Sequence, residues 1–127
     1  MKVVAIVEER KTGIFDIPKP VPGPNQVLIR IHACALCTFE QRVFTQMTKK
    51  TLPYVGGHEL AGVIEEVGAD VDPKLFPVGS KAAARVLKNC GVCYYCRHGQ
   101  ENLCKGAYAK SAAAAGTLTP NGLGEYI

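Results

Sequence analysis

The sequence predicts a mainly β domain with short helices and one metal-binding loop lobe. Residues 27–33 alternate apolar and mixed residues at a period of two, which is typical of a half-buried strand. Prolines at every second position from 18 to 24 exclude helix from the connection that they occupy. The third observation is the stretch 88–106, which holds four of the six cysteines. We therefore expect a partly open sheet structure to which the cysteine lobe is attached.

Two strand regions are expected before residue 34. Residues 1–17 carry short apolar runs broken by charged residues and glycine, which favours two strands joined by a hairpin. Residues 27–33 alternate in polarity and predict a third strand, with His32 on the face away from the core. An isolated histidine of this kind is more often structural than a ligand. The side chains expected to face the core are Val27, Ile29, Ile31 and Ala33.

A short helix is expected to follow Cys37. Thr38 and Gln41 have the spacing of a capping box, which marks a helix N-terminus. The helix dipole would lower the pKa of the Cys37 thiol and favour the thiolate, which suits metal binding or nucleophilic chemistry. A single cysteine at this position is nevertheless more often inert, so the interpretation needs a second motif. Cys34 is expected to be a small buried residue.

The second motif is the pair His58 and Glu59, which lies between glycines and opens a strand-like apolar run. An imidazole and a carboxylate at one strand entrance, with little bulk around them, could both reach a metal ion. The alternative is a glycine turn that leads into a strand and leaves Glu59 in solvent. Farther along, residues 69–76 predict a surface turn and 82–87 a strand.

The rest of the chain is expected to be mostly loop. Residues 112–115 could form a helical turn, but the surrounding glycines and proline favour loop. Residues 122–127 predict a turn into a last strand. They do not form a dinucleotide-binding fingerprint, because the third glycine and the following helix are missing.

The cysteine lobe has the spacing C-x2-C-x2-C-x7-C, which predicts a closed tetrahedral zinc site. An iron-sulfur run is the weaker alternative, since it continues with a three-residue gap and a Cys-Pro pair. Two disulfides would suit a secreted protein, but the first apolar run ends at Glu8, too early for a signal peptide. His98 is expected to lie outside the cluster, because four thiolates already fill a tetrahedron. The predicted ligands are Cys90, Cys93, Cys96 and Cys104.

Composition limits the classes of partner. The 127 residues suit one domain, residues 1–127, and no apolar run is long enough to span a membrane. The formal charge of +4 is scattered over the chain and would fall when thiolates bind zinc, so nucleic acid is not an expected partner. Reduced cysteines indicate a cytoplasmic protein.

The motifs together resemble one known family. The pattern Gly57-His58-Glu59-x2-Gly62-x5-Gly68-x2-Val71 is similar at each fixed position to the zinc signature of zinc-containing medium-chain alcohol dehydrogenases. The likeness is to their catalytic, GroES-like domain and covers essentially the whole chain. It implies a GroES-like partly open β-barrel, in which Cys37 and His58 bind a catalytic zinc and Glu59 is an alternate ligand or lies close behind. It also implies that the four cysteines of the lobe hold a structural zinc.

The resemblance implies an NAD(P)-dependent enzyme acting on a small alcohol or polyol. No strand-Gly-rich-turn-helix motif is present, so we expect the cofactor-binding domain to be absent and this chain alone to be inactive. Phe39 stands where the family usually has the Ser or Thr of a proton relay. The family's Gly-Asp-Arg/Lys-Val, which precedes the lobe, is changed here to 79–82, GSKA, and we interpret this change as structural.

Two other functions stay open at this point. One is a stand-alone structural zinc-binding or interaction module that keeps only the four-cysteine site. The other is the zinc-free quinone reductase branch of the same superfamily, which should lack Cys37, His58 and Glu59. Association into a homo-oligomer is possible in either case.

Overall fold

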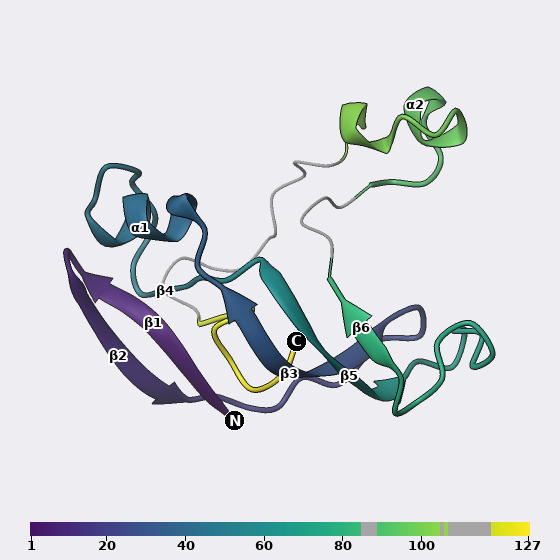
Figure 1. Ribbon diagram of the computed structural model, residues 1–127, viewed down its shortest axis with the longest axis horizontal. Coiled ribbons are helices and arrows are strands. Elements are labelled where there is room, and N and C mark those ends of the chain that lie inside the picture. Colours follow the sequence, from purple (N-terminus) through teal and green to yellow (C-terminus); the bar gives the residue numbers. More distant parts are fainter. Residues whose placement is uncertain (85–88, 105, 107–117) are drawn as a thin grey trace.

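Two small antiparallel sheets make up most of the protein in the computed structural model, which describes residues 1–84, 89–104, 106 and 118–127. One sheet has the strand order β2-β1-β4 and the other β3-β5-β6 (Figure 1). Over the described residues the sheets do not close into a barrel, and the mainly β prediction is confirmed. The strands are β1 Lys2–Glu8, β2 Lys11–Asp16, β3 Val27–Ala35, β4 Tyr54–Val55, β5 Glu59–Val67 and β6 Lys81–Ala83.

The predicted N-terminal hairpin is confirmed. β1 and β2 pair antiparallel from Lys2 with Asp16 to Glu8 with Lys11. β1 also pairs with the short β4, so it is the central strand of its sheet. Val3, Ala5 and Val55 form the buried core of this sheet, and other apolar side chains pack around them.

The predicted core face of β3 is only partly right. Ile29 is buried, but so is its neighbour Leu28, while Ala33 is exposed. The register between β3 and β5 shifts twice, so the simple alternation of the sequence does not persist along the pair. One of these shifts falls between Leu28 and Ile29, which explains how two consecutive residues can both be buried. His32 is exposed, as expected.

The C-terminal residues join the two sheets. The Val4 amide donates to the Leu123 carbonyl at 2.8 Å, and the Ile29 amide donates to the Ile127 carbonyl at 2.8 Å. The predicted last strand is therefore replaced by two isolated bridges, one to each sheet. Because one short segment pairs with both β1 and β3, it cannot remain flat within a single ladder.

The helix predicted after Cys37 is present as α1, Thr38–Phe44, but the predicted capping box is not formed. Cys37 occupies the N-cap position, and no side chain caps the helix. Thr38 is already the first helical residue, one position too late to act as the cap. The other helices are α2, Tyr94–Arg97, and the 3-10 helix η1, Glu101–Leu103.

The remaining predictions concern a turn region and segments that lie partly or wholly outside the described residues. Residues 69–76 form turns, as predicted. The strand expected over 82–87 begins one residue earlier as β6, and its second half lies outside the described residues, as does 112–115. In the part of the chain that the structure describes, no helix has the length and apolar character needed to cross a bilayer.

Candidate metal centres

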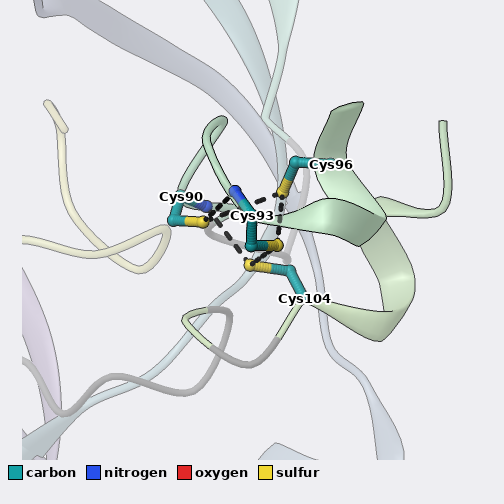
Figure 2. A group of neighbouring side chains, drawn as sticks. All are labelled: Cys90, Cys93, Cys96 and Cys104. Atoms are coloured by element: carbon teal, nitrogen blue, oxygen red, sulfur yellow. Dashed lines mark hydrogen bonds between the residues drawn. The ribbon is translucent and has the colours of Figure 1, made fainter. Parts of the chain in front are cut away.

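The four cysteines of the lobe converge on one point (Figure 2). The sulfur of Cys96 is 3.9 Å from that of Cys90 and 3.5 Å from that of Cys93, and the Cys93 and Cys104 sulfurs are 3.9 Å apart. Ligands at about 2.3 Å from a tetrahedral zinc ion are separated by about 3.8 Å. The spacing of the sulfurs therefore matches a tetrahedral thiolate site, and it is far longer than a disulfide bond.

Short local elements place these sulfurs. Cys93 is the N-cap of α2, Cys96 lies within that helix, and Cys104 follows η1. The Cys90 amide donates to the Cys104 sulfur at 3.3 Å, and the Cys93 amide donates to the Cys90 sulfur at 3.4 Å. Amide donors stabilise the negative charge of a thiolate, so the loop prepares the sulfurs for a cation.

The four sulfurs do not share negative charge equally. Backbone amides of Val92 and Cys93 lower the pKa of the Cys90 thiol to about 6. Desolvation, followed by hydrogen bonds with Cys93 and Cys104, raises the pKa of the Cys96 thiol to about 12. Like charges at this spacing repel one another, so the cluster favours a divalent cation as their counterion.

His98 lies outside the four-sulfur cluster. Its Nδ1 atom is 2.7 Å from the Tyr94 carbonyl oxygen, and its ring stacks on the Tyr94 ring with the centroids 4.0 Å apart. Both contacts belong to the exposed side of α2. The histidine therefore packs on the lobe surface, in keeping with the expectation from the sequence.

A second group of potential ligands forms where β3 passes into α1. Ligand atoms of Cys37, His58 and Glu59 all lie within 4.8 Å of one another. The pairing of β3 with β5 brings these residues together, because Ala35 at the end of β3 pairs with Glu59 at the start of β5. Three protein ligands with a remaining open position are the arrangement of a catalytic zinc site, whereas four closed ligands characterise a structural site.

Sequence reasoning missed Glu40, which supports this second group. The side chain is buried, and its Oε1 atom accepts a hydrogen bond from the Gly57 amide at 3.0 Å. The same oxygen lies 2.9 Å from Nδ1 of His58. With Nδ1 held by a carboxylate, Nε2 is the ring nitrogen left for a metal ion. A buried carboxylate in this place orients the imidazole and raises its basicity as a ligand.

The two glycines before His58 make room for this contact. A Cβ atom on Gly56 would lie 2.9 Å from Cγ of Glu40. Gly57 has a φ of 90°, and a Cβ there would lie 2.8 Å from the Cys34 sulfur. A signal for Glu40 was available: an acidic residue one helical turn beyond a candidate ligand, opposite paired glycines.

Cys34 belongs to neither group of ligands. Its side chain is half-buried rather than fully buried as expected, and it packs close to Gly57 and Gly122. Desolvation raises the pKa of its thiol above the ordinary value. Cys34 is therefore kept as a neutral thiol, which suits packing better than metal binding.

The surroundings of the second group differ on its two sides. A cavity of about 620 Å³ reaches Cys37 and Glu40 and is lined largely by apolar side chains, among them Val4 and Leu123. Phe39 lies elsewhere on α1, and its ring meets the His58 ring edge-on with the centroids 6.0 Å apart. Thr38 keeps its hydroxyl 3.9 Å from the Cys37 sulfur.

Comparisons with known proteins identify the family and the fold of the chain. The family described as alcohol dehydrogenase GroES-like domain matches residues 23–127. L-threonine 3-dehydrogenase of Rhizobium etli is 34% identical over 133 aligned positions, which cover 100% of this chain and 36% of that protein. The chain thus spans about a third of the length of this curated relative.

Solved structures show the same fold. A cobalt- and zinc-bound thermostable alcohol dehydrogenase from Pyrobaculum aerophilum superposes with a TM-score of 0.80 at 26% identity, covering 100% of this chain and 38% of that one. Acetophenone reductase from Geotrichum candidum in complex with NAD gives a TM-score of 0.78 at 30% identity, covering 98% of this chain and 36% of that one.

Proposed function

The chain belongs to the family of alcohol dehydrogenase GroES-like domains, and from this premise we propose that it is the zinc-binding substrate domain of an NAD(P)-dependent alcohol or polyol dehydrogenase. The observation that carries the proposal is the second group of ligands, with its buried carboxylate support. A module that needed only a structural metal would gain nothing from a further site with an open position.

Cys37, His58 and Glu59 fit a catalytic zinc by their chemistry. A thiolate, an imidazole and a carboxylate are all common zinc ligands, and their atoms lie close enough to reach one ion. Zinc bound there would supply a Lewis acid that polarises an alcohol oxygen for hydride transfer. The chain's own part is to place the ligands: Cys37 lies at the N-cap of α1, and Glu40 holds Nδ1 of His58, which would leave Nε2 for the ion.

Water and proton movement are governed by Phe39 and Thr38. The Phe39 ring meets the His58 ring edge-on and places an apolar group beside the imidazole. A phenyl ring cannot carry a proton, so the relay expected of a hydroxyl at this position is absent. Thr38 is the hydroxyl nearest to Cys37 that the described contacts include, and we assign the outward proton step to it or to water.

The lobe has a different role in this proposal. Its four thiolates would hold a structural zinc and replace the hydrophobic core that the lobe lacks, since only Cys104 is fully buried among the described residues 89–104. NAD or NADP would bind to the part that the longer relatives have in addition, so we expect this chain alone not to oxidise alcohols. The thiolate ligands favour a reducing, cytoplasmic setting, and association through that further part would make a homo-oligomer.

Metal content tests the proposal. We expect about two zinc ions in gently purified protein and about one after Cys37→Ala. Cys34→Ala is the matched control, because this neighbouring cysteine belongs to neither group and should leave the content at two. One zinc in all three proteins would overturn the catalytic assignment and leave a module with a single structural site.

A further inference from the structure

The four cysteines of the lobe differ in their access to solvent. Cys90 is exposed, Cys93 and Cys96 are half-buried, and Cys104 is buried with 2% of its surface exposed. All four side chains nevertheless belong to one cluster of sulfurs (Figure 2). A small oxidant dissolved in water therefore reaches Cys90 more readily than it reaches the other three ligands.

Metal binding would keep this exposed sulfur in its reactive form. The nucleophile in cysteine chemistry is the thiolate rather than the thiol, and a thiol that coordinates a metal ion is deprotonated. Susceptibility to oxidation follows thiolate character and exposure together. The zinc that would hold the lobe together thus leaves one of its ligands accessible to a peroxide.

A second sulfur lies within reach of Cys90. The Cys96 sulfur is 3.9 Å away, so its thiolate can attack a Cys90 sulfur that has been oxidised. A disulfide bond is about 2.05 Å long, so the two sulfurs must approach each other by about 2 Å. The backbone beside Cys90 has room for this movement. Gly91 has a φ of 73°, and apart from its chain neighbours no heavy atom of a described residue lies within 4 Å of the position that its Cβ would occupy.

We propose that Cys90 is a site of reversible oxidation by hydroperoxides, that Cys96 completes the reaction by forming a disulfide with it, and that the lobe then releases its zinc. In the first step the Cys90 thiolate attacks one peroxide oxygen, the O–O bond breaks, and the sulfur becomes a sulfenic acid as hydroxide leaves. In the second step the Cys96 thiolate attacks that sulfur, the S–O bond breaks and a second hydroxide leaves. The two cysteines lose two electrons, which reduce one molecule of hydrogen peroxide.

The disulfide would remove two of the four ligands that a closed structural zinc site needs. Among the described residues 89–104 only Cys104 is fully buried, so the lobe has no apolar core that could take the place of the metal. The two sheets have their own strand pairing and should stay folded. This inference goes beyond the proposed function, since it depends on the zinc of the lobe and not on the catalytic assignment of Cys37.

The test uses the zinc-loaded 127-residue chain carrying Cys34→Ala and Cys37→Ala, so that the only thiols left are the four of the lobe. Hydrogen peroxide is added, zinc release is followed with a chromogenic zinc-binding dye, and disulfides are mapped by mass spectrometry after the remaining thiols have been alkylated. We expect the release of about one zinc ion per chain, with a disulfide between Cys90 and Cys96 as the first product. A dithiol should reduce this bond and restore zinc binding.

Two histidine variants separate the exposed sulfur from its neighbours. Cys90→His keeps a closed site with three cysteines and one histidine, but it removes the sulfur that is attacked first, so zinc release should slow. Cys93→His has the same set of ligand types and keeps both Cys90 and Cys96. It should therefore still release zinc and form the same disulfide.

The outcomes bear on this inference separately from the proposed function, which is tested by metal content at Cys37. A first disulfide between Cys93 and Cys96 would overturn the assignment of Cys90, as would equal release rates in the two histidine variants. A lobe that keeps its zinc under peroxide, or that takes up no zinc at the start, would overturn the oxidation-dependent release itself.

Discussion

The two groups of metal ligands are built in opposite ways. The lobe gathers four cysteines from one continuous stretch, and its helices α2 and η1 have only a few residues each. The Cys37 group takes its ligands from two segments that meet because β3 pairs with β5, and it is supported by a buried glutamate. A metal would therefore organise the lobe, whereas the second site is organised by the fold before any metal arrives. Zinc would thus stabilise the fold of the lobe and take part in catalysis at the second site.

The largest expected effect comes from removing a ligand of the lobe. Cys93→Ser should cost the lobe several kcal/mol, a share of the roughly 10 to 16 kcal/mol with which structural zinc binds small domains. Cys37→Ser should leave the fold nearly intact, because sheet pairing holds that region. Thermal unfolding of both variants measures this contrast. Equal losses of melting temperature would show that the two regions do not differ as described.

Acid should weaken the lobe's metal binding, since protons compete with zinc for sulfur. Cys96, with a pKa raised to about 12, must release a proton when metal binds near pH 7. Cys90, with a pKa of about 6, is already a thiolate there and takes up a proton only below that pH. We expect zinc affinity to fall about tenfold from pH 8 to 7 through Cys96 alone, and more steeply below about pH 6, where Cys90 is protonated as well.

Chelator competition across this pH range measures the effect, with each point corrected for protonation of the chelator. Proton release on zinc binding, followed in weakly buffered solution, provides an independent check. An affinity that does not change with pH would contradict the assignment of thiolate ligands in the lobe.

Glu40→Gln should weaken metal binding at the second site by about ten- to a hundredfold, the usual cost of losing a carboxylate behind a ligating histidine. The amide can still accept from Gly57, so the backbone should remain in place. Titration with Co²⁺ measures the affinity at this site and in the lobe separately. Glu125→Gln is a fair comparison, because this exposed glutamate also accepts a backbone amide but lies apart from both ligand groups. A similar loss of metal affinity in the two variants would show that Glu40 has no special role at this site.

The smallest effect is expected for His98→Ala. The histidine stacks on Tyr94 at the surface of the lobe and is not a ligand, so its loss should change stability by no more than about 0.5 kcal/mol. Zinc content should remain the same as in the unchanged protein. Loss of one zinc ion from this variant would place His98 in the metal site after all.

Some features could be predicted from residues close together in the chain. The spacing of the four cysteines indicated a tetrahedral cluster, broken apolar runs indicated the first hairpin, and alternating polarity indicated β3. The start of α1 was also close to the prediction, although its cap was wrong. Each of these depends on a local rule of spacing, and such rules can be applied to a sequence without knowledge of what packs against it.

Other features depended on contacts between distant segments. The burial of Leu28 beside Ile29 follows from register shifts against β5, and no local pattern in β3 reports them. The C-terminal residues pair with β1 and β3 at once, so they form bridges where the sequence alone suggested a strand.

The sequence by itself determined which residues are candidate metal ligands, through the spacing of the four cysteines in the lobe and through the family resemblance for Cys37, His58 and Glu59. Only the tertiary structure decided how they are held. Glu40 lies one helical turn beyond Cys37 in the sequence, but it supports the site only because α1 places it against Gly57 and His58 in a buried space. The type of a residue decides whether its side chain can bind a metal ion, whereas its orientation depends on the segments that the fold brings together.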